Sequence, residues 1–188
     1  MNDTLKAMEA RFSCRDFNEK VPTDEELNLI AQAAIQSPSA MNMQGWQVIV
    51  VKDKSLIDEM DNEIMKLASE MPDKALYERM MERGGKIFYN APRMIVIAIC
   101  DPEEKGSEVF DCGIVAENIV IAAQSLGLAN LHCGLANLAF ESDKAEEFKQ
   151  RLQFPAGYKS GIGILLGHTS NPTAPHVPDQ AKITIISE

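Results

Sequence analysis

The chain of 188 residues lacks several features that mark well-defined classes of protein. Its four cysteines form no C-x-x-C pair and only three histidines accompany them, which argues against a structural zinc site and against a disulfide framework. No apolar run is long enough to span a bilayer, and residues 1–8 have no apolar signal core. Neither G-x-G-x-x-G nor G-x-x-x-x-G-K-S/T occurs. We therefore expect a cytoplasmic protein with reduced thiols, no bound metal and no membrane contact.

Positive charge is also scarce. The chain has 18 Lys and Arg against 28 Asp and Glu, a formal net charge of −10. Such a surface repels nucleic-acid backbones, so no nucleic-acid partner is expected. The hydrophobic fraction of 45% is ordinary for a globular protein, and the length suits one domain, residues 1–188, with a real core. Because the overall electrostatic potential is negative, an anion can bind only where basic residues make the local potential positive.

Apolar periodicity predicts strands separated by helices, and hence a layered α/β or α+β domain. Thr23 and Glu26 form a capping box that begins one of these helices, and Pro38 stops it. The helix at 111–126 is apolar on nearly every side, so it is expected at the centre of the fold. The predicted helices cover residues 5–13, 24–37, 56–67, 73–87, 111–126 and 142–152, and the predicted strands cover 47–51, 94–99, 128–133, 161–167 and 182–187. The strand at 47–51 is expected to be buried.

The last predicted strand follows a loop rich in Pro, Asn and Thr that covers residues 170–180. An isolated terminal strand of this kind either pairs with another subunit, which predicts a homodimer, or forms an edge of its own sheet. The pattern leaves both arrangements open.

An arginine pair flanks a serine near the end of the first predicted helix. Arg11 and Arg15 are four residues apart with Ser13 between them. Guanidinium groups bind phosphate in a bidentate way and a nearby hydroxyl completes the cradle, so an anion site is one interpretation. The other is a solvated pair bridged to Asp16 or Glu19.

The segment between the second helix and the first strand carries amides and small residues. Asn42 and Gln44 suit the edge of a heteroaromatic ring with alternating N–H and C=O groups, such as a flavin pyrimidine. Pro38, Ser39 and Ala40 are small enough to lie flat against such a ring. The alternative is a turn whose amides face water.

Polar groups on the apolar helix at 111–126 need partners when buried. Internal capping and hydrogen bonds between helices are expected for Asp111 and Asn118, while the role of Glu117 stays open. Cys133 is either a redox-active thiol or a small buried hydrophobe.

Five motifs occur in an order that resembles the nitroreductase family of FMN-dependent oxidoreductases. They are RFSCRDF, SPSAMNMQGW, FYNAP, DCGIVAENIVIAAQSLGL and GIGILLG, and they run along almost the whole chain. The resemblance implies an α+β fold with a mixed sheet flanked by helices. It also implies an intertwined homodimer with exchange of the C-terminal strand and two FMN sites at the subunit interface.

The resemblance assigns the phosphate and the nearby ring edge to basic residues. Arg11 and Ser13 match the positions that hold the FMN phosphate, and Lys182 fits a basic C-terminal position that reaches it. Arg15 matches the residue near N1 and the C2 carbonyl, where a cation stabilises the reduced flavin. Phe12 stands in place of the motif's usual second arginine.

The remaining positions that match the family's flavin site are Pro38, Ser39, Ala40, Asn42, Gln44, Cys133 and Gly134. The resemblance implies that the first three pack on the ring from the other subunit. The two amides bind its pyrimidine edge, and the last two form the backbone pair beside N5. Gly45 replaces a usual proline, and Cys133 replaces an acidic residue of some relatives, so no side chain is assigned as catalytic.

The expected function is an oxidoreductase that uses bound FMN and takes electrons from NADH or NADPH. The acceptor would be an electron-poor small molecule such as a nitroaromatic or a quinone, reduced in turn at the same site with ping-pong kinetics. An FMN-binding redox carrier or sensor without nicotinamide turnover is the alternative. A dehalogenase or flavin-consuming synthase is less favoured because no additional lid or site motif is present.

Overall fold

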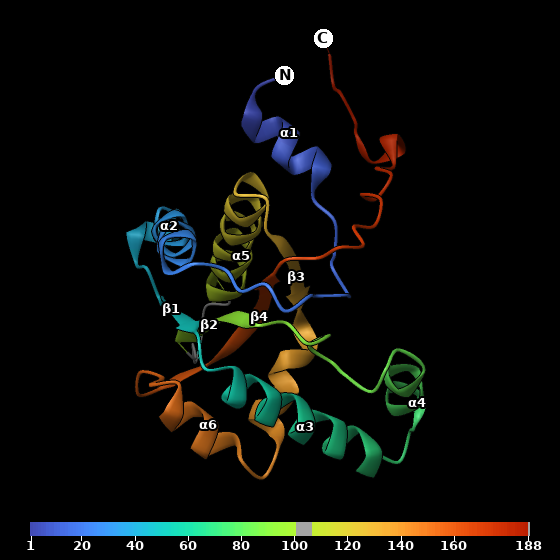
Figure 1. Ribbon diagram of the computed structural model, residues 1–188. Coiled ribbons are helices and arrows are strands. Elements are labelled where there is room, and N and C mark those ends of the chain that lie inside the picture. The colour runs from blue at the N-terminus through green and yellow to red at the C-terminus, as the bar shows by residue number, and fades with distance from the viewer. Residues whose placement is uncertain (101–106, 188) are drawn as a thin grey trace.

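A computed structural model describes residues 1–100 and 107–187 and shows one antiparallel sheet with helices on both faces (Figure 1). Its strands lie in the order β1 (Trp46–Val51), β2 (Arg93–Cys100), β4 (Tyr158–Gly167) and β3 (Ala129–Cys133). The helices are α1 (Asp3–Ala10), α2 (Asp24–Ile35), α3 (Lys54–Glu70), α4 (Ala75–Glu82), α5 (Ser107–Ser125) and α6 (Ala145–Arg151). Three 3₁₀ helices, η1 (Ala40–Asn42), η2 (Gly134–Glu141) and η3 (Gln180–Lys182), complete these elements. The predicted α+β class is confirmed.

The sheet separates two hydrophobic cores because successive side chains of a strand point to opposite faces. In the central strand β2, Met94 and Val96 face the core beneath α3 and η2. Ile95, Ile97 and Ile99 face the core formed with α2 and α5. Burial on both faces explains why this strand reads as a continuous apolar run.

Two predicted helix signals are confirmed. The Thr23 Oγ1 accepts from the Glu26 N–H at 3.2 Å, and the Glu26 carboxylate accepts from the Thr23 N–H at 2.7 Å. Gly127, at a φ of 74°, follows the end of helix α5 as predicted. That left-handed conformation strains other residues and favours glycine. However, α5 covers one face of the sheet and does not lie at the centre of the fold, since Val109 and Phe110 are 64% and 78% exposed.

Glycines in β4 allow the flanking elements to approach the sheet. A Cβ on Gly161 would lie 2.6 Å from the Cys112 Sγ of α5, and one on Gly163 would lie 2.7 Å from the Ala136 Cβ of η2. Neither distance is tolerable for real atoms, so these two positions set how closely both helical layers pack.

Two predicted helices and the expected mixed sheet differ from the structure. Helix α4 is shorter than predicted, because Gly84 and Gly85 adopt left-handed φ values of 92° and 70° and end the helical stretch. Ser142 does not cap α6; it follows η2, and its Oγ accepts from the Lys144 N–H instead. The mixed character expected of the sheet is limited, among the described residues, to one parallel bridge between Ser13 and Asn130.

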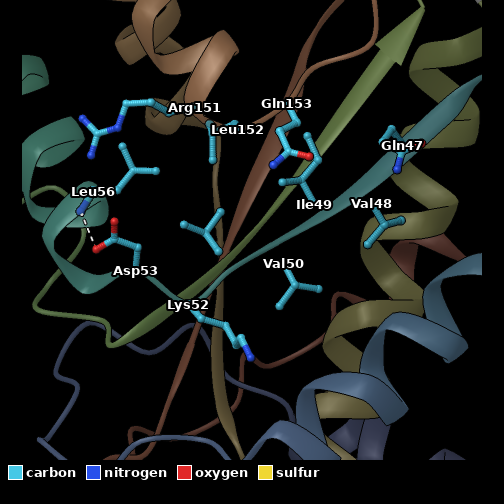
Figure 2. A pocket seen from close by; sticks show the side chains of 11 residues that line it. Gln47, Val48, Ile49, Val50, Lys52, Asp53, Leu56, Arg151, Leu152 and Gln153 are labelled. Carbon is cyan, nitrogen blue, oxygen red and sulfur yellow. Dashed lines mark hydrogen bonds between the residues drawn. The ribbon is translucent and has the colours of Figure 1, made fainter.

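The strand predicted at 47–51 is present as β1, but it is an edge strand and not a buried one. Only Trp46 and Val51 of this strand are buried. A groove of about 480 Å³ runs beside it, with Val48, Ile49 and Val50 along one side and Arg151 from the end of α6 near the other (Figure 2). The outer edge of β1 therefore presents backbone groups that pair with no described strand.

The prediction of a strand at residues 182–187 is wrong for the single chain. Lys182 ends η3, and residues 183–187 extend away from the body without joining the sheet (Figure 1). Ile183, Ile185 and Ile186 are 65%, 84% and 93% exposed. A strand needs a neighbouring strand to receive its backbone hydrogen bonds, and this segment has none among the residues that the structure describes.

Candidate functional site

The loop after α1 is fixed to the sheet through its backbone. Ser13 forms a parallel bridge with Asn130, and the Cys14 N–H donates to the Asn130 carbonyl at 2.9 Å. Asn130 belongs to β3, which ends at Cys133. This pairing places the arginine pair at the same end of the molecule as Cys133 and Gly134.

The two arginines converge on Ser13. The Arg11 guanidinium lies 3.5 Å from the Ser13 Oγ, and that of Arg15 donates to the Ser13 carbonyl at 3.3 Å. Within residues 1–100 and 107–187, neither arginine forms an ion pair with Asp16 or Glu19. The arrangement therefore favours the anion site over the bridged pair. Phe12 points elsewhere and packs against the core on the α3 face.

Arg15, Cys133 and Gly134 line one pocket of about 240 Å³. Leu131 and His132 of β3 form its floor with them, and Tyr89 from the loop before β2 forms a wall. Gly134 is exposed, and a Cβ there would meet no atom within 4 Å, so its backbone faces open space. Arg15 therefore lies at one pocket with Cys133 and Gly134, which are far from it along the chain.

Two further arginines line the same pocket, and the sequence analysis did not identify them. Arg79 lies on α4 and Arg83 directly follows it. Their spacing of four residues is the same signal as that of Arg11 and Arg15, but no neighbouring motif distinguished it from a solvated helix face. The pocket therefore concentrates positive charge on an acidic protein.

Cys133 is a buried, protonated thiol. Burial raises its pKa to about 11, and the nearby Asp61 carboxylate contributes to the rise. A thiolate at neutral pH is thereby excluded, which favours the buried hydrophobe over the redox-active thiol. Burial lowers the pKa of the neighbouring His132, whose Nε2 lies 3.9 Å from the carboxylate of the exposed Glu117.

The segment from Pro38 to Gln44 does not line this pocket. It is largely exposed, and Met41, Asn42 and Gln44 adopt φ values of 51°, 56° and 49°. The Gln44 side-chain amide donates to the Asn42 Oδ1 at 3.1 Å, so the two amides bond each other within the chain. Three strained residues in four are typical of a loop built for contact with something outside the chain.

The helix α5 holds this segment in place. The Ala40 N–H donates to the Asp111 carboxylate at 3.3 Å, and the Asn118 amide donates to the Ser37 Oγ at 2.8 Å. The predicted structural roles of Asp111 and Asn118 are confirmed. Gly45 also has a packing reason, because a Cβ there would lie 2.8 Å from the Cys100 Sγ.

Lys182 is exposed on η3 and makes no ion pair with any residue that the structure describes. It does not line the pocket with Arg15. Among the described residues, no group of histidine, cysteine and carboxylate side chains is arranged to hold a metal ion. No helix in that part of the chain is long and apolar enough to cross a membrane.

The fold and the pocket define a protein of the α+β class with an arginine-lined pocket at the end of β3. The model of the Nitroreductase family matches residues 8–168, and the chain belongs to that family. A nitroreductase with bound FMN from Desulfitobacterium hafniense is 52% identical, with a TM-score of 0.95 over 100% of both chains. An FMN-bound nitroreductase from Bacteroides fragilis shares the fold, with a TM-score of 0.88 over 100% of both chains at 23% identity. Among curated relatives, FMN reductase (NADPH) from Bacillus subtilis is 26% identical over 96% of this chain and 72% of its own length.

Proposed function

We propose that this chain is an FMN-dependent oxidoreductase that takes electrons from NAD(P)H and reduces an electron-poor small molecule such as a nitroaromatic or a quinone. One observation carries the proposal. Arg15, Cys133 and Gly134 meet at one pocket in a chain that is 52% identical to a nitroreductase with bound FMN. Residues 1–188 would then act as a single FMN-binding domain; its cytoplasmic location stays a prediction.

The residues present fit a phosphorylated, heteroaromatic cofactor. The Arg11 guanidinium lies beside the Ser13 hydroxyl and that of Arg15 donates to the Ser13 carbonyl, and cationic and hydroxyl groups bind phosphate and carbonyl oxygens. The open backbone at Gly134 allows close approach of a flat ring. FMN, when bound, supplies the two-electron carrier between the nicotinamide and the acceptor.

The chain's own residues bind and orient in this mechanism. Arg11, Ser13 and Lys182 would hold the phosphate, and Arg15 would place a fixed positive charge near the ring edge that becomes negative on reduction. The thiol of Cys133 fills space beside Gly134 and stays protonated at neutral pH, because burial raises its pKa to about 11. Donor and acceptor use the same pocket in turn, which gives ping-pong kinetics.

The site is completed by a second copy of the chain in this proposal. A pocket of about 240 Å³ is smaller than the roughly 300–1,000 Å³ of common cofactor sites, so the single chain forms only part of the enclosure. The exposed and strained segment 38–44, with Pro38, Ser39, Ala40, Asn42 and Gln44, supplies the missing wall from the partner. A symmetric homodimer forms two such sites.

The exposed tail would hold this dimer together. Residues 183–187 carry three exposed isoleucines, and the groove beside β1 runs along a strand edge that pairs with no described strand (Figure 2). Adding a strand from the partner satisfies the backbone groups of both segments. The strand exchange that the resemblance implies therefore has a donor segment and a receiving edge.

The proposed activity is tested by the colour of the protein and by its reaction with nicotinamides. The purified chain should be yellow or take up added FMN, and anaerobic NADH or NADPH should bleach it rapidly. A colourless protein that takes up no FMN overturns the proposal. Bound FMN that neither nicotinamide bleaches supports the redox carrier or sensor instead.

Deletion of residues 183–188 is expected to convert the dimer into a monomer. It should also weaken FMN binding at least about tenfold, a loss of about 1.4 kcal/mol, because a monomer lacks the wall of the site that the partner supplies. Light scattering measures the mass and a fluorescence titration measures the affinity. Deletion of residues 187–188 alone keeps all three isoleucines and is the control. A truncated chain that remains a dimer with unchanged FMN affinity contradicts the strand exchange.

A further inference from the structure

Arg79 and Arg83 form a cationic pair at the mouth of the pocket that none of the roles above uses. Both are exposed, and both line the pocket that contains Cys133 and Gly134. In the part of the chain that the structure describes, neither side chain forms a hydrogen bond or an ion pair. Together with Arg15, they place three guanidinium groups around about 240 Å³ of space.

This pairing is unfavourable for the helix by itself. Like charges four residues apart on one helix face repel each other. Arg79 lies in the last turn of α4 and Arg83 follows its end, where the helix dipole favours cations, but the dipole does not remove the repulsion between the two arginines. The chain has 28 acidic residues, yet among the described residues none of them forms an ion pair with either arginine. An anion bound between the two guanidinium groups would offset the repulsion.

The position of the two arginines limits the anion. They line the same pocket as Cys133 and Gly134, which is the place proposed above for the reactive edge of FMN. The anionic group must therefore be attached to the ring that is being reduced. A carboxylate meets this condition, because guanidinium groups bind it through paired hydrogen bonds.

We propose that Arg79 and Arg83 select an electron-poor aromatic acceptor that carries a carboxylate. The inference rests on the proposed function. For a nitro group the balanced step is ArNO₂ + NAD(P)H + H⁺ → ArNO + NAD(P)⁺ + H₂O. The nicotinamide is oxidised by two electrons, one N–O bond breaks, and the oxygen leaves as water with the donated hydrogen and a proton from solvent.

The first test compares 4-nitrobenzoate with 4-nitrobenzamide, which has nearly the same shape and no charge. The wild-type holoenzyme should prefer the acid in kcat/KM. Combined replacement of Arg79→Gln and Arg83→Gln should lower kcat/KM for the acid by about 10- to 100-fold, the effect of losing charge-assisted hydrogen bonds, and change that for the amide far less. Lys149→Gln on α6 removes one positive charge away from the pocket and is the control. An unchanged ratio of acid to amide overturns the inference.

The second test measures binding without turnover. Benzoate and benzamide are titrated calorimetrically into the oxidised protein, whether or not a nicotinamide reduces it. Benzoate should bind more tightly than benzamide, and the double variant should lose this difference. Equal binding of both compounds to the wild-type protein overturns the inference, even if NADPH bleaches the flavin. Preferred benzoate binding without any bleaching supports the anion site and contradicts the proposed oxidoreductase.

Two further outcomes would reassign the arginines. A double variant whose NADPH-to-NADH ratio falls, while its acid-to-amide ratio stays unchanged, places them on a phosphate of the donor and overturns the inference. A double variant that loses FMN affinity with an unchanged acid-to-amide ratio places them on the cofactor and also overturns it.

Discussion

Replacement of Arg15 by leucine is expected to weaken FMN binding by about 10- to 100-fold and to lower the flavin reduction potential by about 30–60 mV. The first figure corresponds to the loss of about 1.4–2.8 kcal/mol from a charge-assisted contact. The second follows because about 30 mV corresponds to 1.4 kcal/mol in a two-electron couple. Arg15 supplies a positive charge at the pocket, and reduction adds negative charge to the pyrimidine edge of the ring, so its loss destabilises the reduced form more than the oxidised one.

Fluorescence titration measures the affinity, and spectroelectrochemistry measures the potential. Arg15→Lys keeps the charge and loses the paired hydrogen bonds, so it should retain most of the potential while affinity falls. Lys149→Gln again controls for the change in net charge. If Arg15→Leu leaves both affinity and potential unchanged, Arg15 does not belong to the flavin site.

Replacement of Asp61 by alanine is expected to cost about 2–4 kcal/mol of the free energy of unfolding. Asp61 is 1% exposed on α3, and its Oδ1 accepts from the Ile87 and Phe88 N–H groups at 2.8 and 3.2 Å. Alanine leaves both buried donors unsatisfied, each worth about 1–3 kcal/mol. These donors fix the segment before β2, and Ile87 and Tyr89 of that segment line the pocket. FMN affinity should therefore fall as well.

Asp61→Asn separates the hydrogen bonds from the charge, since the amide oxygen still accepts from both N–H groups. Burial raises the pKa of Asp61 above its ordinary 3.8. A raised carboxyl pKa means that this group's stabilising contribution is fully present below the unfolded pKa and is lost as pH rises through the folded pKa. The difference in stability between Asp61→Asn and wild type should therefore shift in favour of the asparagine variant as pH rises above about 4.

Urea denaturation from pH 3.5 to pH 8 measures this difference. A pH-independent difference between wild type and Asp61→Asn would show that the carboxyl does not titrate differently on folding. An Asp61→Ala variant as stable as wild type would show that the two N–H groups find other partners.

Local signals in the sequence predicted most elements because those signals act over a few residues. The capping box of Thr23 and Glu26, the apolar run of β2 and the stop at Gly127 each depend on neighbours along the chain. The prediction of β1 as a buried strand was wrong, because apolar content does not say which strand lies at the edge of a sheet. Apolar alternation at 182–187 equally cannot say whether a neighbouring strand is within reach.

Some residues of the candidate site could be identified from the sequence and others could not. The motif order identified Arg15, Cys133 and Gly134, and the structure brings these three to one pocket. The motif order did not identify Arg79 and Arg83. Two arginines four residues apart on a charged helix are usually part of a solvated face, and only the turn at Gly84 and Gly85 shows that this helix ends beside the pocket.

The sequence by itself determined the family, the kinds of element and the residues able to bind an anion, because these depend on residue type and short spacing. Only the tertiary structure decided that the Ser13–Asn130 bridge carries Arg15 to the end of β3, and that Cys133 is buried with its pKa raised to about 11. It also decided that segment 38–44 lies outside the pocket and that the C-terminal isoleucines are exposed. Proximity, desolvation and unpaired strand edges arise from contacts between residues far apart in the chain, and no local pattern encodes them.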